Sequence, residues 1–148
     1  NIAIPLMFHD GSLTPQQAFE QARDFIAYAE LTPRLSKRAD SLSLQERKAL
    51  ELARALACKP KLLLIDEVAS GLAAAEVKRF VEHIRHIRDH YGITIIWVEH
   101  IFSALAEVVD RVIVLEQGLV LADGTLNEVV TNERVLETYL GGSAARAG

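Results

Sequence analysis

The chain has very little cysteine, because Cys58 is its only thiol among 148 residues. No disulfide can form within it, which fits a reducing compartment such as the cytosol. It also lacks any apolar run of the roughly 18 residues that a membrane-spanning helix needs. Its first residues show neither the basic start nor the cleavage pattern of a signal peptide. The sequence begins with Asn1 rather than Met, so a fragment, a processed product and the ordered part of a longer protein all stay open.

An excess of positive charge is absent as well. The chain has 16 Lys and Arg against 20 Asp and Glu, which gives a formal net charge of -4. No basic patch stands out in the sequence, so nucleic acid is not expected as a direct partner. Hydrophobic residues make up 50% of the chain, which is enough for a sizeable core, and the length predicts one domain.

Two helices are predicted in the first sixty residues. The first begins at Thr14, and Gln17 completes a capping box with it. The second begins at Ser43, with Glu46 three residues further on, and ends before Pro60. Because no strand pattern separates these helices, they are predicted to form a helical subdomain that packs beside a sheet.

After Pro60 the hydrophobic pattern changes. Residues 62–65 are apolar throughout, and residues 93–98 are apolar except for Thr94, as in strands that are buried in a parallel sheet. A helix with an apolar face is predicted between them, and a third strand is predicted at 111–115. Residues 119–122 are predicted to return antiparallel to that third strand. Strands that alternate with helices indicate an α/β fold with a mostly parallel sheet flanked by helices.

Charged side chains follow the first two predicted strands. Asp66 and Glu67 come directly after the first, and Glu99 and His100 after the second. In an open parallel sheet, ligands bind beyond the carboxyl ends of the strands. An acidic pair there can hold Mg²⁺ through one carboxylate and position a water molecule with the other. The alternative is that strands simply end in loops, where polar residues are common.

The order of several short motifs adds to this interpretation. The sequence Leu-Ser-Leu-Gln-Glu at 42–46 opens a helix that continues through 51–56. It is followed by the acidic pair, by Ser-Gly-Leu at 70–72 and, after a helix and a strand, by His100. In this layout the chain resembles an ATP-binding-cassette (ABC) transporter ATPase from its signature motif through Walker B and the D-loop to the switch histidine. The implied fold is part of a P-loop NTPase core.

The resemblance covers about residues 1–142 and is closest at 53–72. Residues 123–141 resemble the closing segment of the ATPases of branched-chain amino-acid importers. The resemblance divides the chain into a helical signature subdomain at 1–60, the second part of the ATPase core at 61–142 and a flexible tail at 143–148.

The resemblance implies a role for each matching residue. Asp66 corresponds to the Walker B aspartate, which reaches Mg²⁺ through water, and Glu67 to the general base that orients the attacking water. His100 corresponds to the histidine that contacts the γ-phosphate. The signature loop would bind the γ-phosphate of ATP held by the other subunit. Its residues here are Ser43, Leu44, Gln45 and Glu46.

The implied ligands of the complete protein are ATP and Mg²⁺. Its implied partners are a second ATPase subunit, in a homo- or heterodimer, and membrane permease subunits. Such a protein is expected in the cytoplasm, held at the inner face of the cell membrane by the permease and without a membrane span of its own. The solute that is transported is not encoded in this part of the protein.

The sequence departs from the family pattern in the signature loop. The family motif is typically Leu-Ser-Gly-Gly-Gln, whereas residues 42–46 contain no glycine and end in a carboxylate. Glycine eases the close approach of backbone to a phosphate, and Ser43 with Glu46 also forms a plain capping box. Val68 replaces the usual proline after the Walker B glutamate, and Ala73 replaces the D-loop acid or amide.

The glycine-rich phosphate-binding loop is missing. No Gly-x-x-x-x-Gly-Lys-Ser/Thr occurs, and the nearest string, residues 118–125, has the wrong spacing and no lysine. The family's Q-loop is missing too, and residues 1–4 resemble the segment just after it. Without that loop nothing cradles the β- and γ-phosphates. Two hypotheses follow: the chain is a fragment of an active importer ATPase, or it is a truncated module that only binds a partner.

The incomplete core has a consequence for the strand at 62–65. In the parent fold it should be central, so here its exposed edge needs a substitute partner. The edge could pair with a second copy of the chain, or residues 1–8 could cover it. Self-association is the expected state.

Three histidines lie on the helix predicted between the first two strands. His83, His86 and His90 are spaced at i, i+3 and i+7, which could bind a metal. Nearby arginines oppose that, and a solvated helix face is the favoured interpretation. Trp97, in the second strand, is expected in the core.

Overall fold

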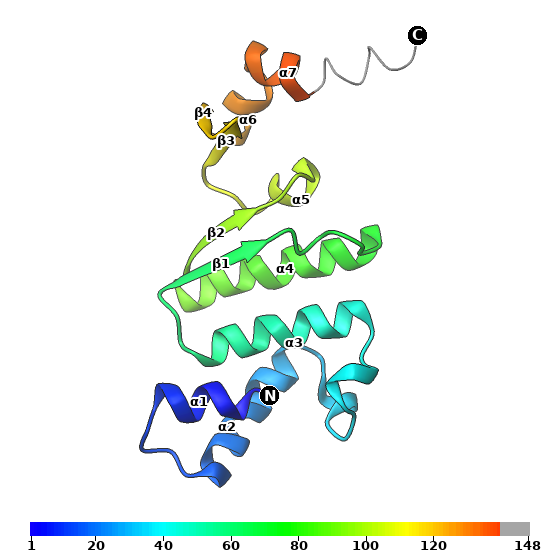
Figure 1. Cartoon of the computed structure of the whole chain (residues 1–148), viewed down its shortest axis with the longest axis vertical. Coiled ribbons are helices and arrows are strands. Elements are labelled where there is room, and N and C mark those ends of the chain that lie inside the picture. Colours follow the sequence, from blue (N-terminus) through cyan, green and yellow to red (C-terminus); the bar gives the residue numbers. More distant parts are fainter. Residues whose placement is uncertain (140–148) are drawn as a thin grey trace. The chain divides into compact units, whose positions relative to one another are not determined.

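A computed structural model of the chain describes residues 1–139 (Figure 1). The chain divides into two compact units, one of residues 1–101 and one from Phe102 onward. The predicted tail at 143–148 lies outside the described residues.

Helices make up the first part of the first unit. Its α-helices are α1 (Ala3–His9), α2 (Pro15–Tyr28) and α3 (Leu44–Ala57). Two short 3₁₀ turns, η1 (Thr32–Arg34) and η2 (Ala39–Ser41), connect α2 to α3. The sequence predicted α2 and α3, and both are confirmed.

Capping boxes start both of the predicted helices. The Thr14 hydroxyl accepts a hydrogen bond from the Gln17 backbone N–H at 3.3 Å, and the Gln17 side chain accepts one from the Thr14 backbone N–H at 2.9 Å. At α3 the corresponding distances between Ser43 and Glu46 are 3.2 and 2.8 Å. Each box satisfies two backbone N–H groups that have no partner within the helix.

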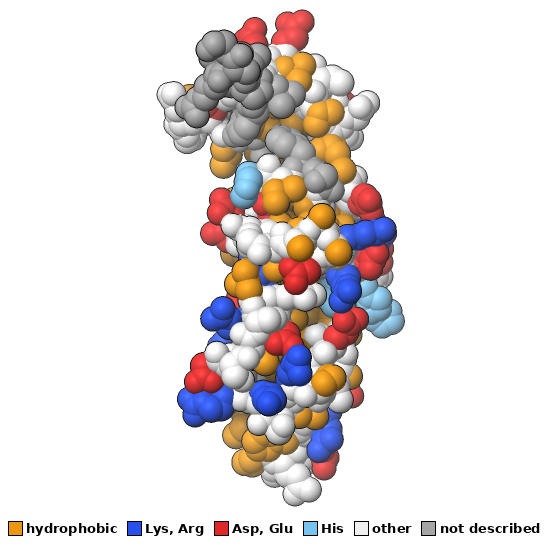
Figure 2. All heavy atoms as spheres, turned by 90° about the vertical axis from the view of Figure 1, so that its right-hand side faces the viewer, with side chains coloured by type: hydrophobic (Ala, Val, Ile, Leu, Met, Phe, Trp, Pro, Cys, Tyr) orange, Lys and Arg blue, Asp and Glu red, His pale blue; other side chains and the backbone are white. Residues whose placement is uncertain are grey.

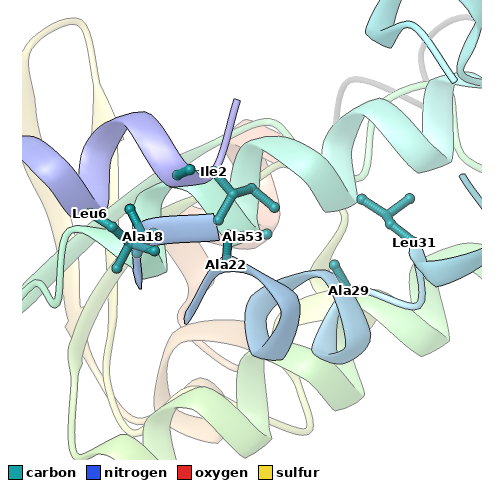
Figure 3. Packing of buried hydrophobic residues seen from close by; sticks show 9 residues of the cluster. Ile2, Leu6, Ala18, Ala22, Ala29, Leu31 and Ala53 are labelled. Atoms are coloured by element: carbon teal, nitrogen blue, oxygen red, sulfur yellow. The ribbon is translucent and has the colours of Figure 1, made fainter. Parts of the chain in front are cut away.

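The three helices share one hydrophobic cluster, and Figure 3 shows small side chains at its centre. Ala18 and Ala22 of α2 are buried, which lets α1 and α3 approach closely. Leu6 of α1 is 1% exposed in this cluster. The suggestion that residues 1–8 cover the edge of the sheet is therefore wrong, because the apolar side of this segment is used against α2 and α3.

A parallel pair of strands follows the helices. β1 (Leu62–Asp66) pairs with β2 (Thr94–Val98), with Leu64 opposite Ile96 and Asp66 opposite Val98. The long helix α4 (Ala74–Tyr91) connects them and ends at Gly92, which adopts a left-handed backbone. This is the βαβ unit that the alternating pattern predicted.

Helix α4 lies along the β1–β2 pair (Figure 1). The Phe80 ring of α4 meets the Trp97 ring of β2 in an edge-on arrangement with centroids 5.9 Å apart. Trp97 is only partly buried, so the expectation that it lies in the core is met in part. Leu63 and Ile65 of β1 are buried.

The opposite face of this pair is not covered. Its apolar side chains remain about half or more exposed: Leu62 48%, Leu64 68%, Ile96 54% and Val98 56%. Residues 62–65 have the pattern of a strand that is buried on both faces, but in this chain one face stays exposed, as expected of a parallel sheet that lacks its neighbouring strands. The reason is that covering two faces needs elements on both sides of a sheet, and α4 supplies only one.

The second unit contains an antiparallel hairpin. β3 (Val112–Glu116) pairs with β4 (Leu119–Gly124), with an irregular register between Val114 and Leu115, and the return strand was predicted. Its described helices are α5 (Phe102–Leu105), α6 (Leu126–Val130) and α7 (Glu133–Tyr139). The unit has its own hydrophobic cluster, built around Val112, Val114, Val129 and Val135.

Acidic and basic side chains are interspersed over the face shown in Figure 2, and no single basic patch occupies it. Among the described residues, no helix is both long enough and apolar enough to cross a membrane.

Candidate active site

The site predicted from the sequence lies where β1 and β2 end. The Glu67 backbone N–H donates to the Val98 carbonyl at 2.9 Å, which extends the pairing of the strands by one hydrogen bond. The loop after each strand therefore starts at the same edge of the sheet. The His100 Nδ1 atom lies 4.0 Å from the Glu67 Oε1 atom. Both side chains are open to solvent, with exposed fractions of 63% for His100 and 60% for Glu67.

Asp66 is the last residue of β1, and its side chain is exposed. By the alternation of the strand it shares a face with Leu62 and Leu64, the uncovered face of the β1–β2 pair. Carboxylate oxygens are the donors that Mg²⁺ prefers. Asp66 is thus available to a cation or its water shell.

Glu67 has an unusual backbone. Its φ is 43°, in the left-handed region, which costs a non-glycine residue on the order of 1–3 kcal/mol. Such a conformation persists only where the surroundings over-determine it. Nothing in the local sequence signals it, because a glutamate after a strand is ordinarily extended or helical.

Glu99 was predicted only as a polar residue at a strand end, and the structure places it differently. Its side chain is fully buried, with 0% exposed. One carboxylate oxygen, Oε1, accepts hydrogen bonds from the backbone N–H groups of His100 at 3.0 Å and Ile101 at 3.4 Å. The other, Oε2, accepts from the Ala69 N–H at 3.2 Å. The carboxylate therefore joins the two loops of the site.

Lys48 of α3 is a second residue that sequence reasoning missed. Its ammonium group donates to the Val68 carbonyl and, at 2.7 Å, to the Ser70 carbonyl. The helix that follows the predicted signature loop is thereby connected to the loop that follows Glu67. The partners lie about twenty residues apart in the chain, so no local pattern could have revealed them.

The predicted signature loop is occupied by its own capping interactions. Hydrogen bonds from the Ser43 backbone N–H and from the Arg34 guanidinium hold the pKa of the Glu46 carboxyl below its usual value. Arg34 also forms an ion pair with Glu46 at 2.5 Å, so the negative charge that Glu46 adds has a basic partner. The structural interpretation of Ser43 and Glu46 as a capping box is confirmed. A nucleotide contact by Ser43 stays a prediction.

Gln45 and Glu46 line a cavity of about 180 Å³, with further lining residues from the end of α2 and from α4. Ligand sites for drug-sized molecules are typically about 300–1,000 Å³. The cavity is therefore too small to hold ATP within this unit.

Leu44 contacts the loop after β1 at Gly71. Gly71 has φ +78°, and a Cβ added there would lie 3.1 Å from the Leu44 Cδ2 atom. Both the left-handed backbone and the close approach favour glycine at this position. The loop that carries Glu67 and the predicted signature loop are thus in contact within one chain.

Replacing Gly71 tests this contact. Gly71→Ala should lower the free energy of unfolding by about 1–2 kcal/mol, because the left-handed conformation is disfavoured for residues with a Cβ. Gly11→Ala is the matched control, since an added Cβ at Gly11 meets nothing within 4 Å and its φ is not left-handed. Urea denaturation of both variants gives the comparison. Equal stability of Gly71→Ala and the parent chain would contradict the proposed packing of this loop.

The histidines of α4 pack on an aromatic ring. Tyr28 lies with its ring centroid 5.5 Å from that of His83 and 5.4 Å from that of His86, and its hydroxyl donates to the His83 carbonyl at 2.9 Å. Burial raises the pKa of Tyr28 to about 12. His86 and His90 are exposed and stack on each other at 5.0 Å. The contacts of Tyr28 with these histidines join α2 to α4. Among the described residues, no group of His, Cys, Asp and Glu side chains is placed to hold a metal.

Comparison with known proteins agrees with the motif order. The family model described as "ABC transporter" matches residues 6–70, and the model described as "Branched-chain amino acid ATP-binding cassette transporter" matches residues 120–145. The high-affinity branched-chain amino acid transport ATP-binding protein LivG of Salmonella typhimurium is 33% identical over 125 residues, which are 84% of this chain and 49% of LivG. The chain belongs to the ABC transporter ATP-binding family. Membership of this family implies nucleotide binding, typically with Mg²⁺.

Solved structures show the same fold for this ABC family member. The ADP conformation of MJ1267, an ATP-binding cassette of an ABC transporter, has a TM-score of 0.77 at 22% identity and covers 94% of this chain and 61% of that one. The dimeric ATP-binding cassette MJ0796 bound to ADP and Pi has a TM-score of 0.74 at 24% identity and covers 84% and 54%. The α/β ABC ATPase fold is therefore confirmed. The chain spans about half the length of the LivG protein that it matches.

Proposed function

We propose that the chain is the second part of the ATP-binding subunit of an ABC importer for branched-chain amino acids or a related solute, and that the complete subunit hydrolyses ATP. The observation that carries this proposal is the pairing of Glu67 with His100 at the carboxyl edge of β1 and β2, 4.0 Å apart. The match of residues 120–145 to the branched-chain amino acid family supports the class of solute.

In the complete subunit, the Glu67 carboxylate orients a water molecule and accepts its proton as the water attacks the γ-phosphate. His100 donates a hydrogen bond to the γ-phosphate, where negative charge develops. Asp66 would hold Mg²⁺ through the water shell of the ion, and the ion would supply positive charge that offsets the charge of the phosphates.

The signature loop is proposed to serve the neighbouring subunit. Ser43, Leu44, Gln45 and Glu46 begin α3, and the N-terminus of a helix offers free backbone N–H groups and a positive dipole end to an anion. The ion pair with Arg34 reduces the repulsion between Glu46 and a phosphate.

The partners follow from this arrangement. The complete subunit is proposed to dimerise with a second ATPase subunit, as the cassette MJ0796 does, and to drive membrane permease subunits from the cytoplasmic side. Within it, residues 1–60 would form the helical signature subdomain and residues 61–142 the second part of the ATPase core.

A truncated module that only binds a partner is the second candidate. The observation in its favour is that the sequence contains no Gly-x-x-x-x-Gly-Lys-Ser/Thr, so the chain by itself lacks the loop that cradles the β- and γ-phosphates.

Calorimetric titration with MgATP separates the two candidates. The chain alone should show no micromolar affinity for MgATP, because the main phosphate contacts are absent. The product of the full reading frame should bind MgATP and hydrolyse it if the first proposal holds. Micromolar binding by the chain alone would contradict the expected weakness, and a full product without hydrolysis would favour the partner-binding module.

A further inference from the structure

The loop that carries Glu67 needs external support. Residues 67–73, here called the catalytic loop, connect β1 to α4. They begin with the left-handed Glu67, whose φ is 43°. Two backbone hydrogen bonds within the loop are long: the Ser70 N–H donates to the Glu67 carbonyl at 3.3 Å, and the Leu72 N–H donates to the Ala69 carbonyl at 3.2 Å. Side chains from other elements must therefore hold the strained residue in place.

Glu99 supplies support from the end of β2. Burying a carboxylate is costly unless hydrogen bonds satisfy it, and three backbone N–H groups do so here. One belongs to the catalytic loop, at Ala69, one belongs to His100 itself, and one belongs to Ile101, which follows it. A single rigid side chain therefore fixes the spacing between the backbone that carries Glu67 and the backbone that carries His100.

Glu99 also meets the imidazole ring. Its Oε1 atom lies 3.3 Å from the His100 Nδ1 atom, closer than the 4.0 Å that separates Nδ1 from Glu67. A carboxylate beside one ring nitrogen fixes the orientation of the ring and leaves the other nitrogen to face a substrate.

Lys48 supplies support from the opposite side. Its ammonium group binds the carbonyls of Val68 and Ser70, the two residues that flank Ala69. Three consecutive backbone units of the catalytic loop are thus tied to two charged side chains, one from α3 and one from the end of β2. Hydrogen bonds to charged groups are among the stronger ones in proteins.

We propose that Glu99 and Lys48 are positioning residues that hold Glu67 and His100 in their reactive geometry. Glu99 sets the distance between the two groups, and Lys48 links that geometry to the helix that begins with the signature loop. The part of this inference that concerns turnover rests on the proposed ATPase function; the part that concerns the catalytic loop does not.

Amide hydrogen exchange of the full reading-frame product, measured by mass spectrometry without nucleotide, tests the loop. In Glu99→Gln one acceptor becomes an NH₂ group that faces a backbone N–H, so the peptide that contains residues 67–72 should exchange about tenfold faster. Glu51→Gln is the matched control, because Glu51 is exposed on α3, and it should leave exchange unchanged. Unchanged exchange of this peptide in Glu99→Gln would overturn the inference.

Variants of Lys48 provide a second test, which applies even if Glu99→Gln does not fold. Lys48→Met keeps the apolar stem and removes the donors, so exchange of the same peptide should rise, while Lys48→Arg should restore protection. Lys78→Met, at an exposed position of α4, is the control. No change in Lys48→Met, or no rescue by Lys48→Arg, would contradict the role of Lys48.

Steady-state kinetics of the same proteins test the effect on turnover. Misplacing a reacting group by about 1 Å costs about 10²-fold in rate, so Glu99→Gln should lower kcat by up to that factor while KM for MgATP changes far less. A rise in KM with an unchanged kcat would contradict positioning. If the unaltered product shows no hydrolysis, the proposed function fails, and the exchange result still decides whether Glu99 and Lys48 hold the catalytic loop.

Discussion

Glu67→Gln in the full reading-frame product should lower the turnover of MgATP by about 10²–10⁴-fold, the usual effect of removing a positioned general base. The amide has the same shape as the carboxylate but cannot accept the proton of the attacking water. MgATP binding should persist, because the role proposed for Glu67 is to act on the water and not on the nucleotide. The measurement is steady-state phosphate release, with calorimetric binding of MgATP alongside it.

Glu20→Gln is the control for this substitution, because Glu20 is exposed on α2 and has no proposed part in the chemistry. It should leave turnover unchanged. Near-normal hydrolysis by Glu67→Gln would remove Glu67 from its proposed role. Loss of both turnover and MgATP binding would show that the glutamate supports the site structurally instead, through the left-handed backbone at that position.

Local signals made much of the fold predictable. The capping boxes at Thr14 and Ser43 start helices at the expected residues because their hydrogen bonds span only three positions. The parallel pair and the return strand after Gly118 followed from changes in hydrophobic period and from turn residues. The order of the motifs also predicted that Glu67 and His100 lie at one edge of the sheet, as they do in the structure.

Features that depend on packing were not predictable. Helix α1 begins at Ala3, has no side-chain cap at Ile2 and is only 7 residues long, so it owes its stability to the burial of Leu6 against α2 and α3. The apolar pattern at 62–65 shows that this strand requires cover on both faces, but it does not show which elements of the chain supply that cover.

The roles of Glu99 and Lys48 in the site were not predictable either, because they also depend on packing. The contacts of Glu99 with Ala69 and of Lys48 with Ser70 join residues thirty and twenty-two positions apart. A polar residue at a strand end or on a helix gives no sign of which backbone groups it will meet. Motif order located the side chains that are proposed to carry the chemistry, whereas only the folded structure identified the residues that are proposed to hold them.

Self-association is the expected state of the isolated chain. Leu62, Leu64, Ile96 and Val98 form an apolar face on the β1–β2 pair that stays about half or more exposed. β1 pairs with β2 alone in the described part of the chain, which leaves a row of backbone groups free to pair with another strand. Residues 1–8 do not relieve this, because Leu6 is buried against α2 and α3. We therefore expect a second copy of the chain to cover the apolar face and the free edge of the β1–β2 pair.

Light scattering at micromolar concentration should report a dimer or a larger species. Leu64→Glu places a charge at the centre of the apolar face, and it should shift the chain toward monomer because a buried unpaired carboxylate is costly. Phe19→Glu is the matched control, since Phe19 is also exposed, at 64%, but lies on α2. Dissociation by Phe19→Glu instead would place the interface on the helices, and a stable monomer of the unaltered chain would show that the exposed face and edge of β1 tolerate water without a partner.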